Sequence, residues 1–285
     1  MKYIKFFSLL LCVVILATML SACKKDSGST KPIIAVSIVP EATFVSAVCG
    51  DYCDVVTMIP SGASPENYAP TPLEIEEFSD SVIYFSIGVP TEENNIMPNV
   101  TENTKVVHLE TEVATIYPDL KLGEDRDPHI WLSPKRVVLM IQIIERELSA
   151  LYPDQTDIFK ANADAFIAQI NQIDTEINTI LQSTTSKAFI VFHPAFGYLA
   201  NDYGLTMYAL EEEGKEATPQ HLQEMIDFAK ENNIKVIFYQ EEIDASQSDS
   251  FAEEIDGKTA CLAPLSADYI SNLRIMADTL ADALN

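Results

Sequence analysis

The strongest constraint on the fold is an uninterrupted helical pattern over residues 154–183. Seven apolar residues recur there at intervals of four and three: Phe159, Ala163, Phe166, Ile170, Ile173, Ile177 and Ile180. This spacing is the period of an amphipathic helix, and no Gly or Pro interrupts it after Pro153. A helix of this length spans about 40 Å, which is more than one small domain needs. The pattern predicts a long helix that serves two domains, and the competing interpretation is a long helix packed inside one domain.

Both flanks of this segment have the same character. Short β-branched runs alternate with amphipathic segments, which is typical of α/β domains with parallel sheets. We therefore predict two α/β lobes, each with a mainly parallel sheet and flanking helices, joined by one long rigid helix. The N-terminal lobe is assigned to residues 32–153, the linking helix to 154–183 and the C-terminal lobe to 184–285.

The N-terminus has the order of a secretory signal. A basic start is followed by an apolar run and then by LSAC at residues 20–23. A Cys directly after small residues resembles the lipobox of a bacterial lipoprotein, so we expect a signal peptide over 1–22, lipidation at Cys23 and a flexible tether over 23–31. A plain signal peptide is the alternative. Either way the protein is expected outside the cytoplasm, and the lipobox implies anchoring to the membrane, on the cell surface or the periplasmic side.

Charge and cysteine content narrow the function further. The formal net charge is −25, which argues against nucleic acid as a partner. Cys49 and Cys53 are four residues apart with no His nearby, so a local disulfide or two free thiols is favoured over a redox or metal pair. Cys261 lies in an apolar run and is expected to be a small core residue.

Candidate ligands follow the ends of predicted strands. His129, His193 and the pair Glu241 and Glu242 stand there, and Glu66 lies in a Pro-rich loop after the second strand. In open α/β sheets ligands bind beyond the carboxyl ends of the strands, and imidazole and carboxylate groups are metal ligands. If the two lobes face each other, these side chains converge on one metal site.

Two other histidines have structural interpretations. His108 falls inside a predicted strand, and His221 falls in the first turn of a predicted helix. Both are therefore expected to be structural rather than metal ligands.

Three stretches resemble the signatures of metal-binding solute-binding proteins of ABC transporters, of the zinc-uptake type. They are SPENY at 64–68, DPHIWLSP at 127–134, and FHPAFGY at 192–198 with DYGL at 202–205. The resemblance runs in order through nearly the whole mature chain. It implies two α/β lobes joined by a long helix, one Zn²⁺ or Mn²⁺ bound between the lobes, and delivery of the ion to a membrane permease by a monomeric carrier that is not an enzyme.

The chain departs from this family pattern in its ligands. Glu66 stands where the family usually has His, and residues 262–265 offer no Asp where many members have one. A His-rich loop is also missing and is replaced by the acidic stretch 110–127. The resemblance therefore implies a site of Glu66, His129 and His193, with a fourth ligand from Glu241, Glu242 or water; we assign Glu241.

Zinc is the favoured metal because His193 occupies a position that the manganese branch of this family usually fills with Glu. Mn²⁺ remains the alternative, since two imidazoles with carboxylates also suit it. An enzyme alternative is a secreted zinc hydrolase with Glu241 or Glu66 as general base, but no His-Glu-x-x-His pattern is present. A third class is an adhesive or structural lipoprotein with an incidental metal.

Overall fold

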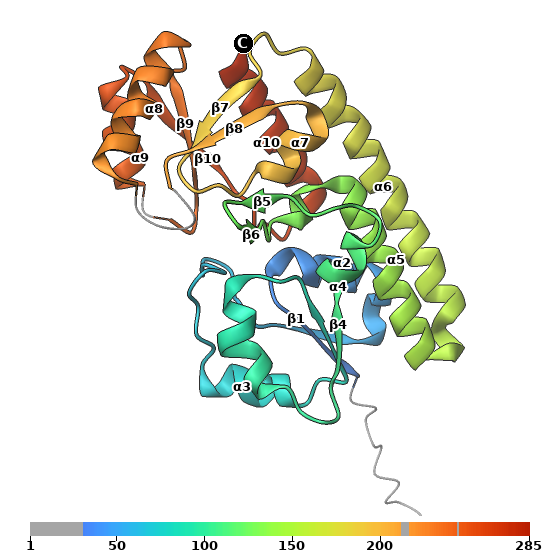
Figure 1. Cartoon of the computed structure of the whole chain (residues 1–285). Coiled ribbons are helices and arrows are strands. Elements are labelled where there is room, and N and C mark those ends of the chain that lie inside the picture. The colour runs from blue at the N-terminus through green and yellow to red at the C-terminus, as the bar shows by residue number, and fades with distance from the viewer. Residues whose placement is uncertain (1–30, 212–216, 244) are drawn as a thin grey trace, which may run out of the picture. The chain divides into compact units, whose positions relative to one another are not determined.

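Helix α6 (Thr156–Gln182) runs along both halves of the molecule in the computed structural model (Figure 1). The structure describes residues 31–285 except 212–216 and 244. The signal peptide, Cys23 and almost all of the tether lie outside the described residues. Pro32–Asn285 forms one compact unit, and none of the helices described in it is long and apolar enough to cross a membrane.

The buried face of α6 is the one that the sequence periodicity predicts, with one change at its end. Leu181 completes the buried stripe, whereas Ile180 is only partly buried. The helix packs against α2 (Val39–Cys49) and α5 (Pro134–Leu151) at one end and against α10 (Tyr269–Leu284) at the other. One continuous apolar core consequently runs from the N-terminal half through α6 into the C-terminal half.

The N-terminal lobe is built on a four-stranded parallel sheet. Its strands are ordered β2-β1-β3-β4, with the bounds β1 Ile33–Val36, β2 Asp54–Thr57, β3 Ile83–Ser86 and β4 Lys105–His108. Besides α2, the lobe contains α3 (Pro72–Ser79) and α4 (Leu109–Ala114). Thr71 and Glu74 form the capping box of α3, so the Pro-rich loop ends in a well-defined helix start.

The C-terminal lobe repeats the same plan. Its parallel sheet is ordered β10-β9-β7-β8, with the bounds β7 Ala188–Val191, β8 Thr206–Ala209, β9 Val236–Gln240 and β10 Lys258–Leu262. Its helices besides α10 are α7 Gly197–Tyr203, α8 Pro219–Glu231 and α9 Ser246–Glu254. A second apolar cluster packs α8 and α9 against this sheet. The predicted fold class of two parallel sheets with flanking helices is confirmed, while the domain boundaries stay a prediction.

The stretch 110–127 is more ordered than its acidic composition suggests. It contains α4 and a short antiparallel hairpin of β5 (Lys121–Leu122) and β6 (Asp125–Arg126), which leads directly into His129. Charged residues on such short strands give no apolar alternation, so the sequence carries no strand signal there.

The cysteines divide into a confirmed and a corrected expectation. Cys49 and Cys53 form a disulfide that joins the end of α2 to the start of β2. Cys261 is exposed, contrary to the expected core position. The reason is that β10 is an edge strand, so part of it faces solvent despite its apolar sequence.

Candidate metal centre

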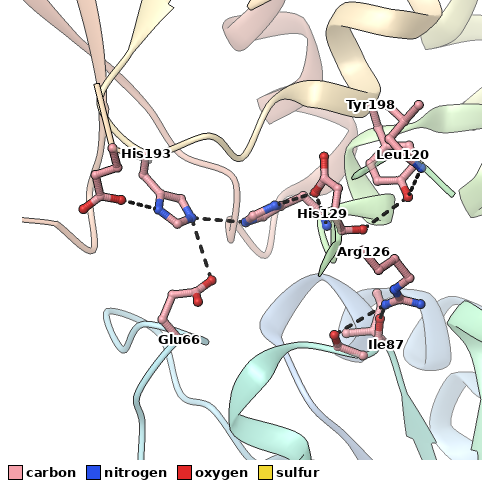
Figure 2. Close-up of polar contacts among 10 residues, drawn as sticks. Glu66, Ile87, Leu120, Arg126, His129, His193 and Tyr198 are labelled. Carbon is pink, nitrogen blue, oxygen red and sulfur yellow. Dashed lines mark hydrogen bonds and ion pairs between the residues drawn. The ribbon is translucent and has the colours of Figure 1, made fainter. Parts of the chain in front are cut away.

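Three of the predicted ligands meet at one point. One ligand atom from each of Glu66, His129 and His193 lies within 4.8 Å of the others. Figure 2 shows Glu66 approaching from its loop on one side and the two imidazoles from the other. Both histidines are 6% exposed, whereas the Glu66 side chain is 36% exposed.

Each histidine is oriented by a carboxylate. Nδ1 of His129 lies 2.8 Å from Oδ1 of Asp127, and Nδ1 of His193 lies 2.7 Å from Oε2 of Glu211. An ionised carboxylate only accepts hydrogen bonds, so each Nδ1 carries the hydrogen and each Nε2 presents a lone pair. Metal-binding histidines usually have such a hydrogen bond, which fixes the orientation of the ring.

The two Nε2 atoms face each other at 3.4 Å. Two lone pairs at this distance repel unless a cation or proton lies between them. Tetrahedral ligands at about 2.05 Å from zinc lie roughly 3.3 Å apart, so the observed separation fits a shared zinc ion. Glu66 Oε1 is 3.8 Å from His193 Nε2 and can complete a third corner with a small adjustment.

The cavity at this point is very small, about 10 Å³. It is lined by Ser64, Pro65, Glu66, His129, Trp131, His193, Gln240, Glu242, Ile243, Pro264 and Leu265. A space of this size holds one ion or water molecule and excludes an organic ligand.

The glutamate pair after β9 behaves differently from the assignment made from sequence. Glu241 is exposed and does not line the cavity, whereas Glu242 does. Oε2 of Glu242 is buried without a hydrogen-bond partner among the described residues, and burial raises the pKa of this carboxyl group. A buried carboxylate oxygen without a protein partner, on a residue that lines this cavity, is suited to serve as a cation ligand.

The segment that carries His129 is attached to the C-terminal lobe. Asp127 packs so closely on α7 that a Cβ at Gly197 would lie 2.6 Å from Oδ2 of Asp127. The Tyr198 hydroxyl donates to the Asp127 carbonyl at 3.2 Å, and the indole of Trp131 donates to the Pro264 carbonyl at 2.9 Å. His129 and His193 are therefore both held by the C-terminal lobe.

Residues just beyond His129 strengthen this attachment. Arg136, buried on α5, reaches Asp202 of α7 at 3.4 Å and stacks over the Tyr198 ring. Ser133, which precedes α5 and makes no side-chain hydrogen bond to its first turn, donates its hydroxyl to Asp202 at 2.5 Å. The same hydroxyl oxygen accepts a hydrogen bond from Nη1 of Arg136 at 3.2 Å, so Ser133, Arg136 and Asp202 form one network.

The remaining histidines lie elsewhere. His108 contacts Ser86 and Glu110 at 2.9 and 3.2 Å from its Nδ1, and Nε2 of His221 lies 3.0 Å from the Ala209 carbonyl. Neither belongs to the metal cluster, as the sequence interpretation expected.

Comparison with known proteins identifies the family. The family model described as "Zinc-uptake complex component A periplasmic", ZnuA, matches residues 34–283. The chain belongs to the ZnuA family. A solved structure titled "Crystal structure of ZnuA" covers 90% of this chain at 34% identity, with a TM-score of 0.84 over all of that chain.

Curated relatives of the ZnuA-family chain carry zinc in their names. "Zinc-binding lipoprotein AdcA" of Streptococcus pneumoniae (strain ATCC BAA-255 / R6) is 27% identical over 92% of this chain, which spans 55% of that relative's length. "High-affinity zinc uptake system protein ZnuA" of Bacillus subtilis (strain 168) is 26% identical, with 91% of this chain and 89% of the relative covered. The chain thus spans little more than half of some relatives and most of others.

The sequence did not predict the two carboxylates that orient the histidines, Glu211 and Asp127. Glu211 opens the acidic run 211–213, and nothing in that run distinguishes it from its neighbours. Asp127 lies within the family-like stretch 127–134, but its role depends on a contact with Nδ1 of His129 that only the folded chain shows. Spacing of two residues from His129 was the one available signal for Asp127.

Proposed function

We propose that this protein captures a single Zn²⁺ outside the cytoplasm and delivers it to the permease of an ABC transporter. The observation that carries the proposal is the pair of Nε2 lone pairs, 3.4 Å apart, on two histidines whose Nδ1 atoms are held by carboxylates. The match to the zinc-uptake family and the names of the relatives support zinc as the cargo.

The proposed ligands are His129, His193, Glu66 and Glu242. The first three already converge, and Glu242 replaces Glu241 in this proposal because its orphaned oxygen lines the cavity. Two nitrogens and two carboxylate oxygens satisfy the tetrahedral shell of zinc. The oxygen content also keeps Mn²⁺ as the alternative cargo, since carboxylate ligands suit manganese.

The hydrolase interpretation has no support from the comparisons. The matched family is an uptake component rather than an enzyme. The cavity of about 10 Å³ also leaves no space for a peptide or ester beside the ion. Equilibrium capture without turnover is the function that fits this site.

Attachment to the membrane belongs to the same proposal. We place lipidation at Cys23, after removal of residues 1–22, and regard residues 23–31 as a tether for a monomeric carrier. The AdcA relatives of Streptococcus pneumoniae are named lipoproteins, which supports this assignment.

Loading is proposed to move the Glu66 arm more than the histidines. His129 and His193 are both fixed to the C-terminal lobe, whereas Glu66 sits on a loop in the N-terminal lobe. The histidine pair can receive the ion first, and Glu66 and residues 240–243 can then close on it. Helix α6 contains no Gly or Pro and offers few soft dihedral angles for a wide hinge.

The test is a zinc competition titration with a chromophoric chelator on the purified protein. We expect one ion per chain, and His129→Ala and His193→Ala should each weaken binding severely because each removes a nitrogen ligand. His221→Ala is the matched control, since this histidine lies outside the cluster. Near-normal affinity in either ligand variant contradicts the proposal.

A further inference from the structure

A buried glutamate outside the metal cluster, Glu92, holds a loop that contacts the segments carrying two of the ligands. Glu92 is 4% exposed and begins the short π-helical segment η2 (Glu92–Ile96). Its carboxylate accepts hydrogen bonds from the backbone N–H groups of Ile87 and Gly88, both at 2.8 Å, and from the hydroxyl of Ser37. The chain from residue 87 to 92, called the 87–92 loop below, is therefore wrapped around one carboxylate.

On one side this loop holds the Glu66 arm. The backbone N–H of Thr91 donates to the carbonyl of Pro65 at 3.1 Å, and Pro65 directly precedes Glu66. The side chain of Asn95, one turn further, donates to the carbonyl of Tyr68 at 2.7 Å. The ligand loop is thus anchored on both sides of Glu92, by Thr91 in the 87–92 loop and by Asn95 in η2.

On the other side the same loop holds the His129 arm. Nη2 of Arg126 donates to the carbonyls of Ile87 and Gly88 at 2.9 and 3.4 Å, and Arg126 directly precedes Asp127 (Figure 2). Gly88 has a φ of +83°, and a Cβ there would lie 2.1 Å from Nη2 of Arg126. Position 88 therefore admits the guanidinium only because it is glycine.

We infer that Glu92 is a positioning residue that couples the two ligand arms to a proton. Its ionised carboxylate holds the 87–92 loop, and through it Glu66 and the Asp127–His129 stretch, in the arrangement that binds the cation. Protonation of Glu92 weakens the bonds to the loop and lowers the affinity of the site for metal. The inference rests on the proposed metal-binding function and adds a group that is not a ligand.

The surroundings of Glu92 support a proton that exchanges near neutrality. Glu41 on α2, Glu110 on α4 and the Tyr84 hydroxyl on β3 face it, and Arg126 approaches through the loop carbonyls. Burial is the main cause that raises the pKa of Glu92 to about 7, with a smaller contribution from the charge of Glu110 and with the hydrogen bonds to the carboxylate opposing both. No Lys or Arg among the described residues forms an ion pair with Glu92.

The same cluster contains an incompletely satisfied carboxylate. Glu41 is fully buried, and its Oε1 has no hydrogen-bond partner among the described residues. The other oxygen of Glu41 accepts from the backbone N–H groups of Ser37 and Ile38, each at 3.0 Å. Three carboxyl groups, those of Glu41, Glu92 and Glu110, therefore lie together at the carboxyl ends of β1, β3 and β4, and burial raises the pKa of Glu41 as well as that of Glu92.

Because the ionised carboxylate of Glu92 holds the arrangement that binds the cation, metal uptake and proton release are linked even though they involve different atoms. By reciprocity, a fall in pH lowers metal affinity through Glu92 in addition to any direct protonation of the imidazoles. The device gives a carrier a second way to release its ion in acid.

The experiment counts protons released when Zn²⁺ binds, from calorimetric enthalpies in buffers of different ionisation enthalpy. Enthalpies remain measurable even when binding is too tight for the affinity to be fitted. Wild type at pH 7 is compared with Glu92→Gln, and Glu77→Gln is the matched control because it removes an exposed carboxylate of the same lobe. We expect Glu92→Gln to release about half a proton fewer and Glu77→Gln to match wild type.

The affinities should follow the same pattern. At pH 8, Glu92→Gln should bind Zn²⁺ roughly tenfold more weakly than wild type, and at pH 6 the two should converge, because the amide mimics the protonated acid. A folded Glu92→Gln protein with the proton count and pH profile of wild type overturns the inference.

A second variant keeps the test decisive if Glu92→Gln does not fold. Ser37→Ala removes one hydrogen bond to the ionised carboxylate, so the pH midpoint of zinc binding should move upward. An unchanged midpoint in Ser37→Ala overturns the inference. Absence of zinc binding in wild type would instead refute the proposed function, so the two failures are distinguishable.

Discussion

Asp127→Asn is the perturbation that most sharply tests how the site is built. Asp127 is 1% exposed, and its Oδ1 accepts from both the backbone N–H and the Nδ1 of His129, at 2.9 and 2.8 Å. Asparagine keeps the size but removes the charge that fixes the imidazole tautomer. Loss of the group that orients a ligating histidine typically lowers metal affinity 10- to 100-fold, which corresponds to about 1.4 to 2.7 kcal/mol of binding free energy.

The assay is chelator competition at fixed pH on Asp127→Asn, His129→Ala and the double variant. Asp127 acts through His129, so Asp127→Asn should add little once His129 is gone. Asp125→Asn, an exposed carboxylate two residues earlier, is the matched control. Wild-type affinity in Asp127→Asn, or the same loss with and without His129, refutes the reasoning.

Three further outcomes are expected. Replacing Cys49 and Cys53 by Ser should lower the free energy of unfolding by about 2 kcal/mol in urea titrations, because the bridge closes a short loop. Zinc affinity should not change, because neither cysteine belongs to the metal cluster. Loss of zinc binding would contradict a purely structural role for the disulfide. The pKa of Glu92 in the folded protein is about 7, above the ordinary 4.5, so its contribution to the free energy of unfolding of the metal-free protein is complete below pH 4.5 and disappears as the pH rises through 7. Up to about 3 kcal/mol of the free energy of unfolding should be lost from this group over that range. Glu92→Gln should abolish this part of the pH dependence in urea titrations. Hydrogen exchange should show zinc-induced protection mainly at residues 64–68 and 240–243, and large changes along α6 would contradict local closure.

Periodicity revealed much of this fold because it reports directly on burial. The apolar stripe of α6 and the β-branched runs of both sheets are local signals, and each matches an observed element. Burial on an edge strand is not local, which explains why Cys261 was wrongly expected in the core. The β5–β6 hairpin is likewise held by its neighbours rather than by its own sequence, for example through the Leu120 N–H and the Tyr198 hydroxyl at 3.0 Å.

The candidate site shows the same division. His129 and His193 could be predicted because each lies in a family-like stretch after a predicted strand, and the folded chain brings them together with Glu66. The choice between Glu241 and Glu242 depends on how one turn directs successive side chains, which the sequence does not encode in any pattern. The role of Glu92 could not be predicted from the sequence either, because the backbone N–H groups that its carboxylate accepts from are present at almost any residue.

X-ray absorption at the zinc edge of the loaded protein tests the central claim most directly. The account predicts one zinc per chain with four nitrogen or oxygen ligands at about 2.0–2.2 Å, two of them imidazoles, and no sulfur. Loaded His193→Ala should lose one imidazole from the spectrum. A sulfur ligand, a shell without imidazole, or an unchanged imidazole count in His193→Ala would contradict the account.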